Sequence, residues 1–500
     1  MGFSPSPSRG EGGVRVIHRF VQTEFISPTR QLLRVLKPYK IQGSSTTSPR
    51  ENMETLSPKS KEKKVFMETF GCQSNVLESD HVTGLLLKDN FTMTQKQEDA
   101  DVILFNTCSI RDHAEHKVFS RLGQLVDWKN DREGRVIGIM GCMATSYKDQ
   151  LIERAPHLDM VVGPDQYLKV PQVIREAAGN GISQVLADFD PIYFPENDPN
   201  RLSQPHKAFI EIMKGCDKFC TFCVVPFTRG REISRPAESI LDEITKIAQA
   251  GVKEVMLLGQ NVNSYGLGLK SRGKTDSFAQ LLRQVGEIKG IERVRYMTSH
   301  PLDMPDDLIE VMADVPAVCE SIHLPVQCGS DKVLKRMNRQ YSVEHYLERV
   351  AKLRGRVKDL FITTDLIVGF PGEEEKDFQG TLDLLDKVHY DAVYSFKYSP
   401  RLGTPAARML DQVPEEVMDE RLARLNEKAW KHAGECCETR VGKTEEVLVD
   451  GPADKTPDAF YGKSRQNRTV VFPGKGYKTG DMVQVKIESH KVANLYGKTM

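Results

Sequence analysis

Six of the ten cysteines of this 500-residue chain fall into two sets of three whose spacing could support metal chemistry. The upstream cysteines are far apart, and each follows a short apolar run: Cys72, Cys108 and Cys142. The downstream cysteines form a tight C-x3-C-x2-C pattern: Cys216, Cys220 and Cys223. A closed structural zinc site normally has four ligands, whereas thiolates in threes leave one position open. The two sets therefore predict iron–sulfur clusters, each with one iron free for chemistry.

The tight spacing of the downstream cysteines indicates what the open iron could bind. Three thiolates can hold three irons of a [4Fe–4S] cluster, and the fourth iron can then take a small chelating ligand. The amine and carboxylate of S-adenosyl-L-methionine suit that position, and an electron from the cluster would release an adenosyl radical. A zinc site would need a fourth ligand, such as His206 or His300. A zinc-holding RNA-binding protein without catalysis is therefore the alternative of another class.

Composition narrows the class of protein. Apolar residues make up 39% and charged residues 28% of the chain, which is typical of a globular protein. Basic and acidic residues balance at 69 each, so an RNA site would have to be a local patch. No apolar run approaches the roughly 18 residues that span a bilayer, so we expect no membrane partner. We interpret Cys319, Cys328, Cys436 and Cys437 as buried apolar cysteines in a reducing compartment.

Residues 1–63 differ from the rest in being rich in Ser, Pro and Arg. Residues 1–64 hold 12 Lys or Arg against 5 Asp or Glu and show no sustained periodicity. Such a leader can be a transit peptide, a disordered extension, or the result of a start codon placed too early. Met53 and Met67 lie closer to the first predicted strand, and no amphipathic Arg-rich helix emerges. We favour the last two interpretations.

Strands and helices alternate along residues 64–180, and each upstream cysteine comes where a strand ends. Strands are predicted at 64–70, 101–106, 135–140 and 159–163, and helices near 76–88 and 114–128. This alternation predicts a mostly parallel sheet, whose strands have their carboxyl ends at one ligand-binding edge. The three cysteines can therefore meet at one point. Three unrelated core cysteines are the alternative, but the position after a strand recurs three times.

A second alternation fills residues 206–438, after a linker predicted at 181–205 from its Asp, Pro and Asn content. Strands are predicted at 207–213, 253–258, 292–297, 320–324, 361–367 and 392–397. Helices are predicted near 237–250, 277–289, 306–314, 342–354 and 375–388. Six βα units predict a partial (β/α)6 barrel in place of the closed eight-unit form. The downstream cysteines follow its first strand and so lie at the catalytic mouth.

Residues 439–500 have a different sequence pattern, with short β-rich runs separated by Gly and Asp. This pattern is typical of a small antiparallel β-barrel. The segment holds 11 Lys or Arg and 7 Asp or Glu, a local excess of four positive charges. The whole chain is thus predicted to be an α/β protein with a parallel α/β domain, a partial barrel and a small β-barrel.

Several segments together resemble the radical S-adenosylmethionine methylthiotransferase family, and within it the MiaB-type tRNA enzymes. In the predicted barrel these are MKGC at 213–216, VVPFTRGRE at 224–232, GQNVNSY at 259–265, SHP at 299–301, HLPVQ at 323–327 and GFPGE at 369–373. Upstream they are TFGCQSN at 69–75, NTC at 106–108 and GC at 141–142. The resemblance runs from about residue 64 to 500. Cys328 departs from it, because relatives usually carry Ser there.

The resemblance implies the cofactors and their ligands. The downstream cysteines would hold the [4Fe–4S] cluster that binds S-adenosylmethionine, and the upstream cysteines a second, auxiliary [4Fe–4S] cluster that supplies sulfur. Phe222 would pack beside the adenine of the cofactor, and Gln260, Asn261 and Gln327 are assigned to cofactor binding. The scheme needs few acids or bases. We therefore interpret His323 as a barrel-strand residue, and His113 and His116 as helix surface.

The resemblance also implies the substrate and partners. The substrate would be N6-isopentenyladenosine at position 37 of tRNA, beside the anticodon, and the product would carry a methylthio group on carbon 2. Threonylcarbamoyl adenosine, or an aspartate of a ribosomal protein, is the alternative substrate. Carbon 2 is an unactivated C–H position, which favours radical chemistry over removal by a base. We expect a cytoplasmic monomer that uses an electron donor such as flavodoxin or ferredoxin and an unidentified sulfur source.

RNA contacts are predicted at two places. The C-terminal barrel resembles the TRAM domain, an OB-like RNA-binding module, and a basic strand and turn with one aromatic are the predicted contacts: Tyr461, Lys463, Arg465, Asn467 and Arg468. A solvated hairpin face is the alternative. Near the downstream cysteines, Arg229 and Arg231 are predicted to contact phosphate or a cofactor carboxylate.

Overall fold

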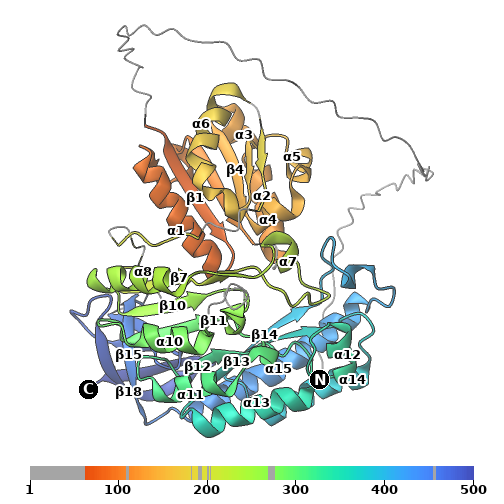
Figure 1. The fold of residues 1–500 in the computed structure, drawn as a ribbon, viewed down its shortest axis with the longest axis vertical. Helices are drawn as coiled ribbons and strands as arrows, with labels where there is room; N and C mark the ends of the chain where they lie inside the picture. Colours follow the sequence, from red (N-terminus) through yellow and green to blue (C-terminus); the bar gives the residue numbers. More distant parts are fainter. Residues whose placement is uncertain are drawn as a thin grey trace, which may run out of the picture. The chain divides into compact units, whose positions relative to one another are not determined.

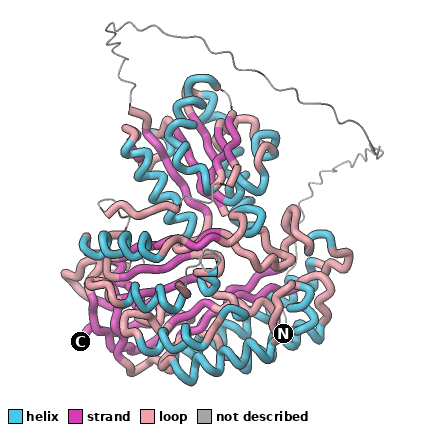
Figure 2. Tube along the Cα trace, in the orientation of Figure 1, coloured by secondary structure: helices cyan, strands magenta, loops and turns pink. Residues whose placement is uncertain are grey.

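The computed structural model describes residues 62–108, 112–181, 183–189, 194–199, 202, 204–267, 276–453, 456 and 458–500. The predictions made for residues 1–61 lie outside the described residues. Figure 1 and Figure 2 show the described elements, with helices flanking the strands in the N-terminal α/β part. Within the part of the chain that the structure describes, no helix combines the length and apolarity needed to cross a membrane.

The N-terminal part is a six-stranded parallel sheet with the order β2-β1-β3-β4-β5-β6. Its strands are β1 (Lys64–Phe70), β2 (Thr92–Met93), β3 (Val102–Thr107), β4 (Val136–Gly141), β5 (Met160–Val162) and β6 (Gln184–Leu186). Its helices are α1 (Gln73–Lys88), α2 (Asp112–Gly123), α3 (Val126–Asn130), α4 (Cys142–Tyr147), α5 (Gln150–Arg154) and α6 (Val170–Asn180). β3 and β4 are fully buried, because helices cover both faces of the sheet. The predicted parallel sheet is confirmed, and β6 extends it into the segment predicted as a linker.

The central part contains six parallel strands in two three-stranded sheets, β11-β10-β7 and β12-β13-β14. They are β7 (Lys207–Glu211), β10 (Glu254–Leu258), β11 (Arg293–Met297), β12 (Ser321–His323), β13 (Phe361–Val368) and β14 (Ala392–Lys397). An isolated parallel bridge between Val294 and Val318 links β11 to the segment just before β12. The predicted partial barrel of six βα units is confirmed.

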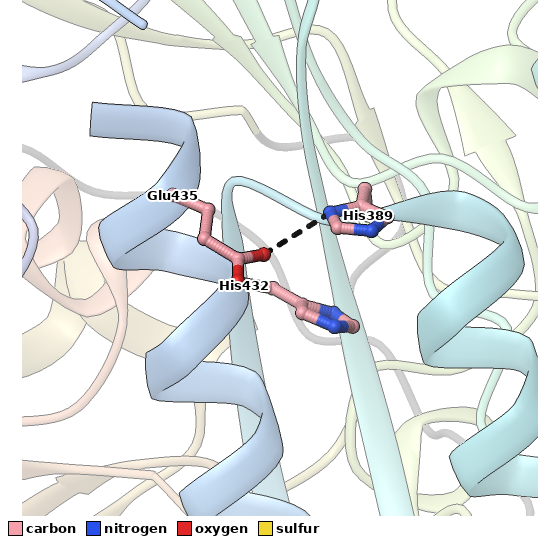
Figure 3. A group of neighbouring side chains, drawn as sticks. All are labelled: His389, His432 and Glu435. Carbon is pink, nitrogen blue, oxygen red and sulfur yellow. Dashed lines mark ion pairs between the residues drawn. The ribbon is translucent and has the colours of Figure 1, made fainter. Parts of the chain in front are cut away.

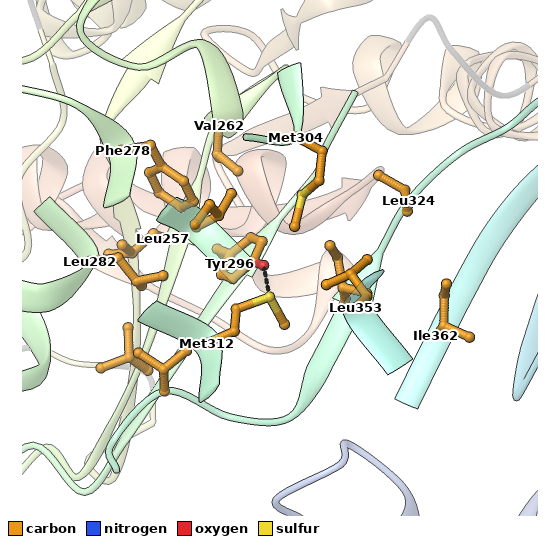
Figure 4. Close-up of a cluster of buried hydrophobic side chains, with 14 of the residues drawn as sticks. Leu257, Val262, Phe278, Leu282, Tyr296, Met304, Met312, Leu324, Leu353 and Ile362 are labelled. Carbon is orange, nitrogen blue, oxygen red and sulfur yellow. Dashed lines mark hydrogen bonds between the residues drawn. The ribbon is translucent and has the colours of Figure 1, made fainter. Parts of the chain in front are cut away.

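Helices alternate with these strands and bury their apolar stripes against them. They are α8 (Ala237–Gln249), α10 (Phe278–Gly286), α11 (Asp306–Asp314), α12 (Asp331–Arg336), α13 (Val343–Arg356) and α14 (Glu375–Val388). In α8, Ile240, Ile244 and Ile247 recur at helical spacing and are fully buried. Figure 4 shows the core between these layers, where Phe278 and Tyr296 meet edge to face at 5.1 Å.

Shorter elements connect the barrel units. Next to the downstream cysteines lie β8 (Met213–Lys214), β9 (Ile233–Ser234) and α7 (Val225–Thr228). Short 3-10 helices are Gln97–Asp99, Pro164–Lys169, Val262–Ser264, Pro301–Asp303 and Ala406–Arg408. A long helix that the sequence analysis did not predict, α15 (Glu415–Glu438), packs on β14 and leads into the C-terminal part.

The C-terminal part is a closed five-stranded barrel with the order β15-β16-β17-β19-β18. Its strands are β15 (Thr444–Pro452), β16 (Ala459–Ser464), β17 (Thr469–Pro473), β18 (Met482–Lys491) and β19 (Asn494–Thr499). The predicted small barrel is confirmed. All its pairs are antiparallel except β17 with β19.

Buried arginines attach this barrel to the central part. Arg293 donates to the carbonyl oxygen of Lys463 at 2.7 Å, and Arg295 to that of Ser464 at 2.8 Å. Arg465 pairs with Glu320, while Arg468 is buried in an ion pair with Asp391. Both guanidinium groups thus pair with carboxylates across this junction, and the predicted RNA contacts by Arg465 and Arg468 stay a prediction.

The buried Arg468–Asp391 pair should dominate the stability of the junction. Arg468→Ala leaves the Asp391 carboxylate buried without a cation, which costs about 3–5 kcal/mol of unfolding free energy. Lys498→Ala is the control, since its pair with Glu488 has side chains 68% and 49% exposed and contributes at most about 1 kcal/mol. Chemical denaturation of both variants checks this. Equal losses in the two would contradict it.

Candidate functional site

The three upstream cysteines lie at one edge of the N-terminal sheet, at the carboxyl ends of neighbouring strands. Cys72 caps α1 after β1, Cys108 follows β3, and Cys142 begins α4 after β4. A hydrogen bond with Cys108 lowers the pKa of Cys72, so these two side chains touch. Burial raises the pKa of Cys142, and the Cys72 sulfur adds to that rise. The structure thus brings the three thiols together, while their role as cluster ligands stays a prediction.

Glycine and asparagine residues hold the strand ends close enough for this. Gly141 has a φ of 94°, and a Cβ there would lie 2.4 Å from the Thr107 carbonyl oxygen. Asn75 is fully buried, accepts from the backbone N–H of Cys72 at 3.1 Å and donates to Asn106 at 3.0 Å. These contacts connect the end of β1 to the end of β3. The protein's own hydrogen bonds and the close packing at Gly141 therefore hold the local backbone in place.

Arg229 is buried beneath the upstream cysteines. Its Nε donates to Cys142 Sγ at 3.2 Å, and its guanidinium pairs with Glu78 at 2.7 Å. Tyr167 donates to the other oxygen of Glu78 at 2.9 Å. The side chain is enclosed by these protein groups, and its predicted contact with phosphate or a cofactor carboxylate stays a prediction. The sequence did not predict that the Arg229 side chain would contact Cys142. This contact links the segment after the downstream cysteines to the upstream set.

The downstream cysteines lie on a loop that follows β8. Gly215 has a φ of 71°, and a Cβ there would lie 2.2 Å from the Arg231 carbonyl oxygen, so only glycine fits. The Gly215 N–H donates to Gln260 Oε1 at 2.6 Å. Burial raises the pKa of Cys216 to about 11 and that of Cys223 to about 12. Metal binding here must therefore release protons from these thiols.

Arg339 is a site residue that the sequence analysis missed. It is buried, donates to Cys220 Sγ at 3.3 Å, and donates to the Pro325 carbonyl oxygen at 2.9 Å. The preceding residue supports the same cysteine loop, because Asn338 donates to the Phe219 carbonyl oxygen at 3.0 Å. No motif marks this arginine in the sequence. Its position depends on the fold of the segment after α12.

The carboxyl ends of β10 and β11 present buried polar atoms that have no hydrogen-bond partner. Among the described residues these include Asn261 Oδ1, Thr298 Oγ1, Ser299 Oγ and His300 Nε2. Unpaired polar atoms are rare in protein interiors and indicate a missing polar ligand. S-adenosylmethionine carries an amine, a carboxylate and hydroxyl groups, so this donor and acceptor set fits it. The predicted role of Asn261 in cofactor binding is consistent with this arrangement.

The other predicted cofactor residues occupy varied environments. Phe222 meets Phe370 edge to face with ring centroids 6.4 Å apart, on one side of the loop. Gln260 is already engaged by Gly215, and Gln327 is buried with a φ of 76°. Their contacts with the cofactor stay predictions. His323 bonds Thr363 at 2.9 Å on the neighbouring strand, as expected of a barrel-strand residue.

The proposed zinc ligands do not converge on the downstream cysteines as a set. His206 precedes the amino end of β7 and pairs with Asp450 of the C-terminal barrel at 3.1 Å, whereas the cysteines follow the carboxyl end of that strand. His300 lies after β11, and burial together with Arg339 lowers its pKa. His206 is therefore removed as the fourth ligand of a zinc site.

The remaining residues predicted to contact RNA lie beside the downstream cysteines and on the C-terminal barrel. Arg231 is exposed, pairs with Asp217 at 2.6 Å and lies over the Phe219 ring at 5.4 Å. Phe219 is 41% exposed. Of the contacts predicted on β16, Tyr461 is exposed, whereas Lys463 is half-buried and donates to Thr469 at 2.8 Å. The RNA-contact role of Arg231, Tyr461 and Lys463 stays a prediction.

Glu232 provides a pH-dependent test of the mouth. Burial raises its pKa from the usual value near 4.5 to about 7, although Ser264 donates to it at 2.6 Å. Because the pKa of Glu232 is higher in the folded state than in the unfolded state, the folded protein binds this proton more tightly. The stability gained from that proton is lost as the pH rises toward 7. Glu232→Gln should therefore raise the thermal midpoint, relative to the parent chain, more at pH 8 than at pH 6.

The control for this experiment is Glu287→Gln, which alters an exposed carboxyl at the end of α10. Scanning calorimetry at the two pH values should show little change for that variant, because exposed substitutions usually have small effects. A Glu232→Gln difference that is the same at pH 6 and pH 8 would contradict the assigned titration.

Comparisons with known proteins match all three parts of the chain. Three family models match: "Radical SAM superfamily" at residues 210–385, "Uncharacterized protein family UPF0004" at 64–163 and "TRAM domain" at 438–499. These ranges contain the downstream cysteines, the upstream cysteines and the C-terminal barrel, respectively.

Curated relatives extend this similarity over most of the chain. A protein from Thermoanaerobacter sp. (strain X514) is 42% identical over 89% of this chain and 95% of its own length. One from Paraburkholderia xenovorans is 45% identical over 85% and 94%. One from Bacteroides thetaiotaomicron is 43% identical over 87% and 96%. All three are named tRNA-2-methylthio-N(6)-dimethylallyladenosine synthase.

Solved structures resemble the fold at low sequence identity. The radical S-adenosylmethionine methyltransferase TsrM from Kitasatospora setae, with tryptophan and a cofactor analogue, matches with a TM-score of 0.50. The identity is 12%, and the match covers 74% of this chain and 89% of that one. At this identity the similarity concerns the fold alone.

Proposed function

We propose a function for this chain from its membership of a family: it belongs to the tRNA-2-methylthio-N(6)-dimethylallyladenosine synthases, radical S-adenosylmethionine enzymes. The chain transfers a methylthio group to carbon 2 of N6-isopentenyladenosine at position 37 of tRNA. The observation that carries the proposal is the contact between Arg229 and Cys142, because it joins the segment after the downstream cysteines to the upstream set. Two metal-binding sets in one site suit a reaction that needs both a radical and a sulfur donor.

The downstream cysteines would hold a [4Fe–4S] cluster with S-adenosylmethionine, and the upstream cysteines a second [4Fe–4S] cluster. With its cofactor bound, such a site supplies a radical able to attack an unactivated C–H bond, and a sulfur source. The donor sets fit these groups, because each offers three thiols on a preformed backbone. A cluster spreads its ligands over several irons, so the thiols need not gather around one ion as a tetrahedral zinc site requires.

The chain's own charged residues would stabilise these thiolates. Arg229 and Arg339 each place a guanidinium N–H on one cysteine sulfur, at 3.2 Å and 3.3 Å. Hydrogen bonds from a cation to a thiolate favour its charged form and adjust the potential of a bound cluster. Both arginines are buried, so water does not screen them. We assign them as positioning residues, one for each cysteine set.

The tRNA would contact exposed aromatic and basic groups. Phe219 and Arg231 lie beside the mouth, and Tyr461 lies on the C-terminal barrel. Exposed lysines on β18 and β19 add a further basic surface: Lys486, Lys491 and Lys498. Stacking on aromatic rings and contacts to phosphate are how proteins usually bind unpaired RNA bases. A cytoplasmic monomer with a flavodoxin or ferredoxin partner and an unidentified sulfur source completes the proposal.

The division of labour between the cysteine sets has a direct test. The reconstituted parent chain should hold about eight irons in two clusters. Cys72→Ala should hold about four and still cleave S-adenosylmethionine, because the downstream cysteines are intact, but it should form no methylthio product. Nucleoside mass spectrometry of tRNA from a deletion strain carrying each variant measures the product.

The matched control is Cys319→Ala, which removes a buried thiol outside both sets. It should keep about eight irons and full methylthiolation. Loss of cofactor cleavage together with methylthiolation in Cys72→Ala would refute the separate roles. If a deletion strain that carries Cys72→Ala makes as much methylthio product as one that carries the parent chain, the assignment of an auxiliary cluster is refuted.

Tyr461 tests the RNA surface without disturbing the buried arginine junction. If its ring stacks on a base, Tyr461→Ala should weaken tRNA binding by about 1–3 kcal/mol and leave the salt dependence unchanged, because no charge is removed. Trp430→Ala, at a ring 65% exposed on α15, is the control and should bind as the parent does. Filter binding at several salt concentrations measures both. Equal affinities for Tyr461→Ala and the parent would remove Tyr461 from the interface.

A further inference from the structure

Three side chains far from both cysteine sets gather on the outside of the barrel. His389 caps the end of α14, and His432 and Glu435 lie one turn apart on α15. One potential ligand atom from each lies within 4.8 Å of the others. Figure 3 shows the three side chains next to one another. The His389 and His432 rings stack with centroids 4.2 Å apart, and His389 Nδ1 is 3.8 Å from Glu435. Two imidazoles and a carboxylate are a common ligand set for zinc.

His432 shows that this group is more than a chance surface cluster. It is only 5% exposed, and its Nδ1 is buried without a hydrogen-bond partner. Its other nitrogen, Nε2, lies 3.4 Å from Asp386, whose second oxygen is held by Lys428 at 2.6 Å. Metal-bound histidines characteristically give their second nitrogen to a carboxylate. The arrangement orients the ring and leaves one buried nitrogen without a partner, which calls for a ligand.

The other two side chains have the freedom that an incoming ion needs. The His389 and Glu435 side chains are 50% and 47% exposed, so they can reach an ion from solvent and close on it. Zinc–nitrogen bonds of about 2.0–2.1 Å require the ligand atoms to draw together, and exposed side chains can do this at little cost. Solvent would supply the remaining positions. The buried His432 ring would stay in place, and the exposed His389 and Glu435 side chains would move toward an ion bound to it.

We propose that His389, His432 and Glu435 form a binding site for a divalent transition-metal ion of the zinc class, separate from the iron–sulfur clusters. Its nitrogen and oxygen donors differ from the thiolates that hold iron, which keeps the two kinds of metal apart. The ion joins the turn between α14 and β14 to α15, the helix that leads into the C-terminal barrel. The site is therefore structural, and it fastens the helix on which that barrel depends.

Zinc titration of the reconstituted chain tests the proposal. Isothermal titration with zinc sulfate, under anaerobic conditions, should reveal one site while the visible absorbance of the clusters stays constant. His389→Gln and Glu435→Gln should each lower the affinity at least about tenfold, because each removes a ligand. Both side chains are exposed, so these variants fold. His490→Gln is the matched control, since His490 faces Glu438 at 2.9 Å but belongs to no group of three ligands among the residues that the structure describes; it should bind zinc as the parent does.

X-ray absorption at the zinc edge supplies a second measurement. The site should show only nitrogen and oxygen neighbours at about 2.0–2.2 Å. Sulfur neighbours at about 2.3 Å would place the zinc on cysteines and overturn the proposal. Unchanged affinity in both His389→Gln and Glu435→Gln would overturn it as well. Because these readouts do not involve methylthiolation, the proposed enzymatic function stands or falls separately.

Discussion

The site depends on a buried cation that holds two parts of the chain together. Arg229 comes from the loop after the downstream cysteines, yet its guanidinium lies among Cys142, Glu78 and Tyr167 at the edge of the N-terminal sheet. Burial raises the pKa of Glu78 and would favour its neutral form without a cation beside it. A charged group in such surroundings is tolerated only when its partners are complete. The contact therefore ties the segment after the downstream cysteines to the upstream set.

Each cysteine set thus has an arginine of its own, and the two arginines differ in origin. Arg229 reaches across from another part of the chain, whereas Arg339 belongs to the same barrel as Cys220. Cations beside thiolates offset the negative charge of a bound cluster, which shifts the reduction potential of that cluster. The strand ends supply the thiols, and residues from other segments adjust their electrostatics.

The sequence was sufficient to predict the architecture, because regular elements follow short-range patterns. The buried runs at β3 and β4, and the spacing of Ile240, Ile244 and Ile247 on α8, leave little choice of element. α15 was missed because its charged residues obscure a narrow apolar stripe. Arg468 was taken for a surface residue, since only the tertiary fold brings Asp391 to it. The place of Arg229 likewise depends on packing between segments far apart in sequence.

The junction made by Arg293 and Arg295 has a consequence for how a folded RNA could be accommodated. Both guanidinium groups are enclosed and satisfy main-chain oxygens of the neighbouring module. Any rotation of the barrel at this point would take these main-chain acceptors from two buried guanidinium groups, which would keep their pairing with Glu254. These contacts therefore restrict rotation of the outer β-module relative to the central part. Under the proposed function, an RNA would have to present its stem and its modified nucleoside at one set separation.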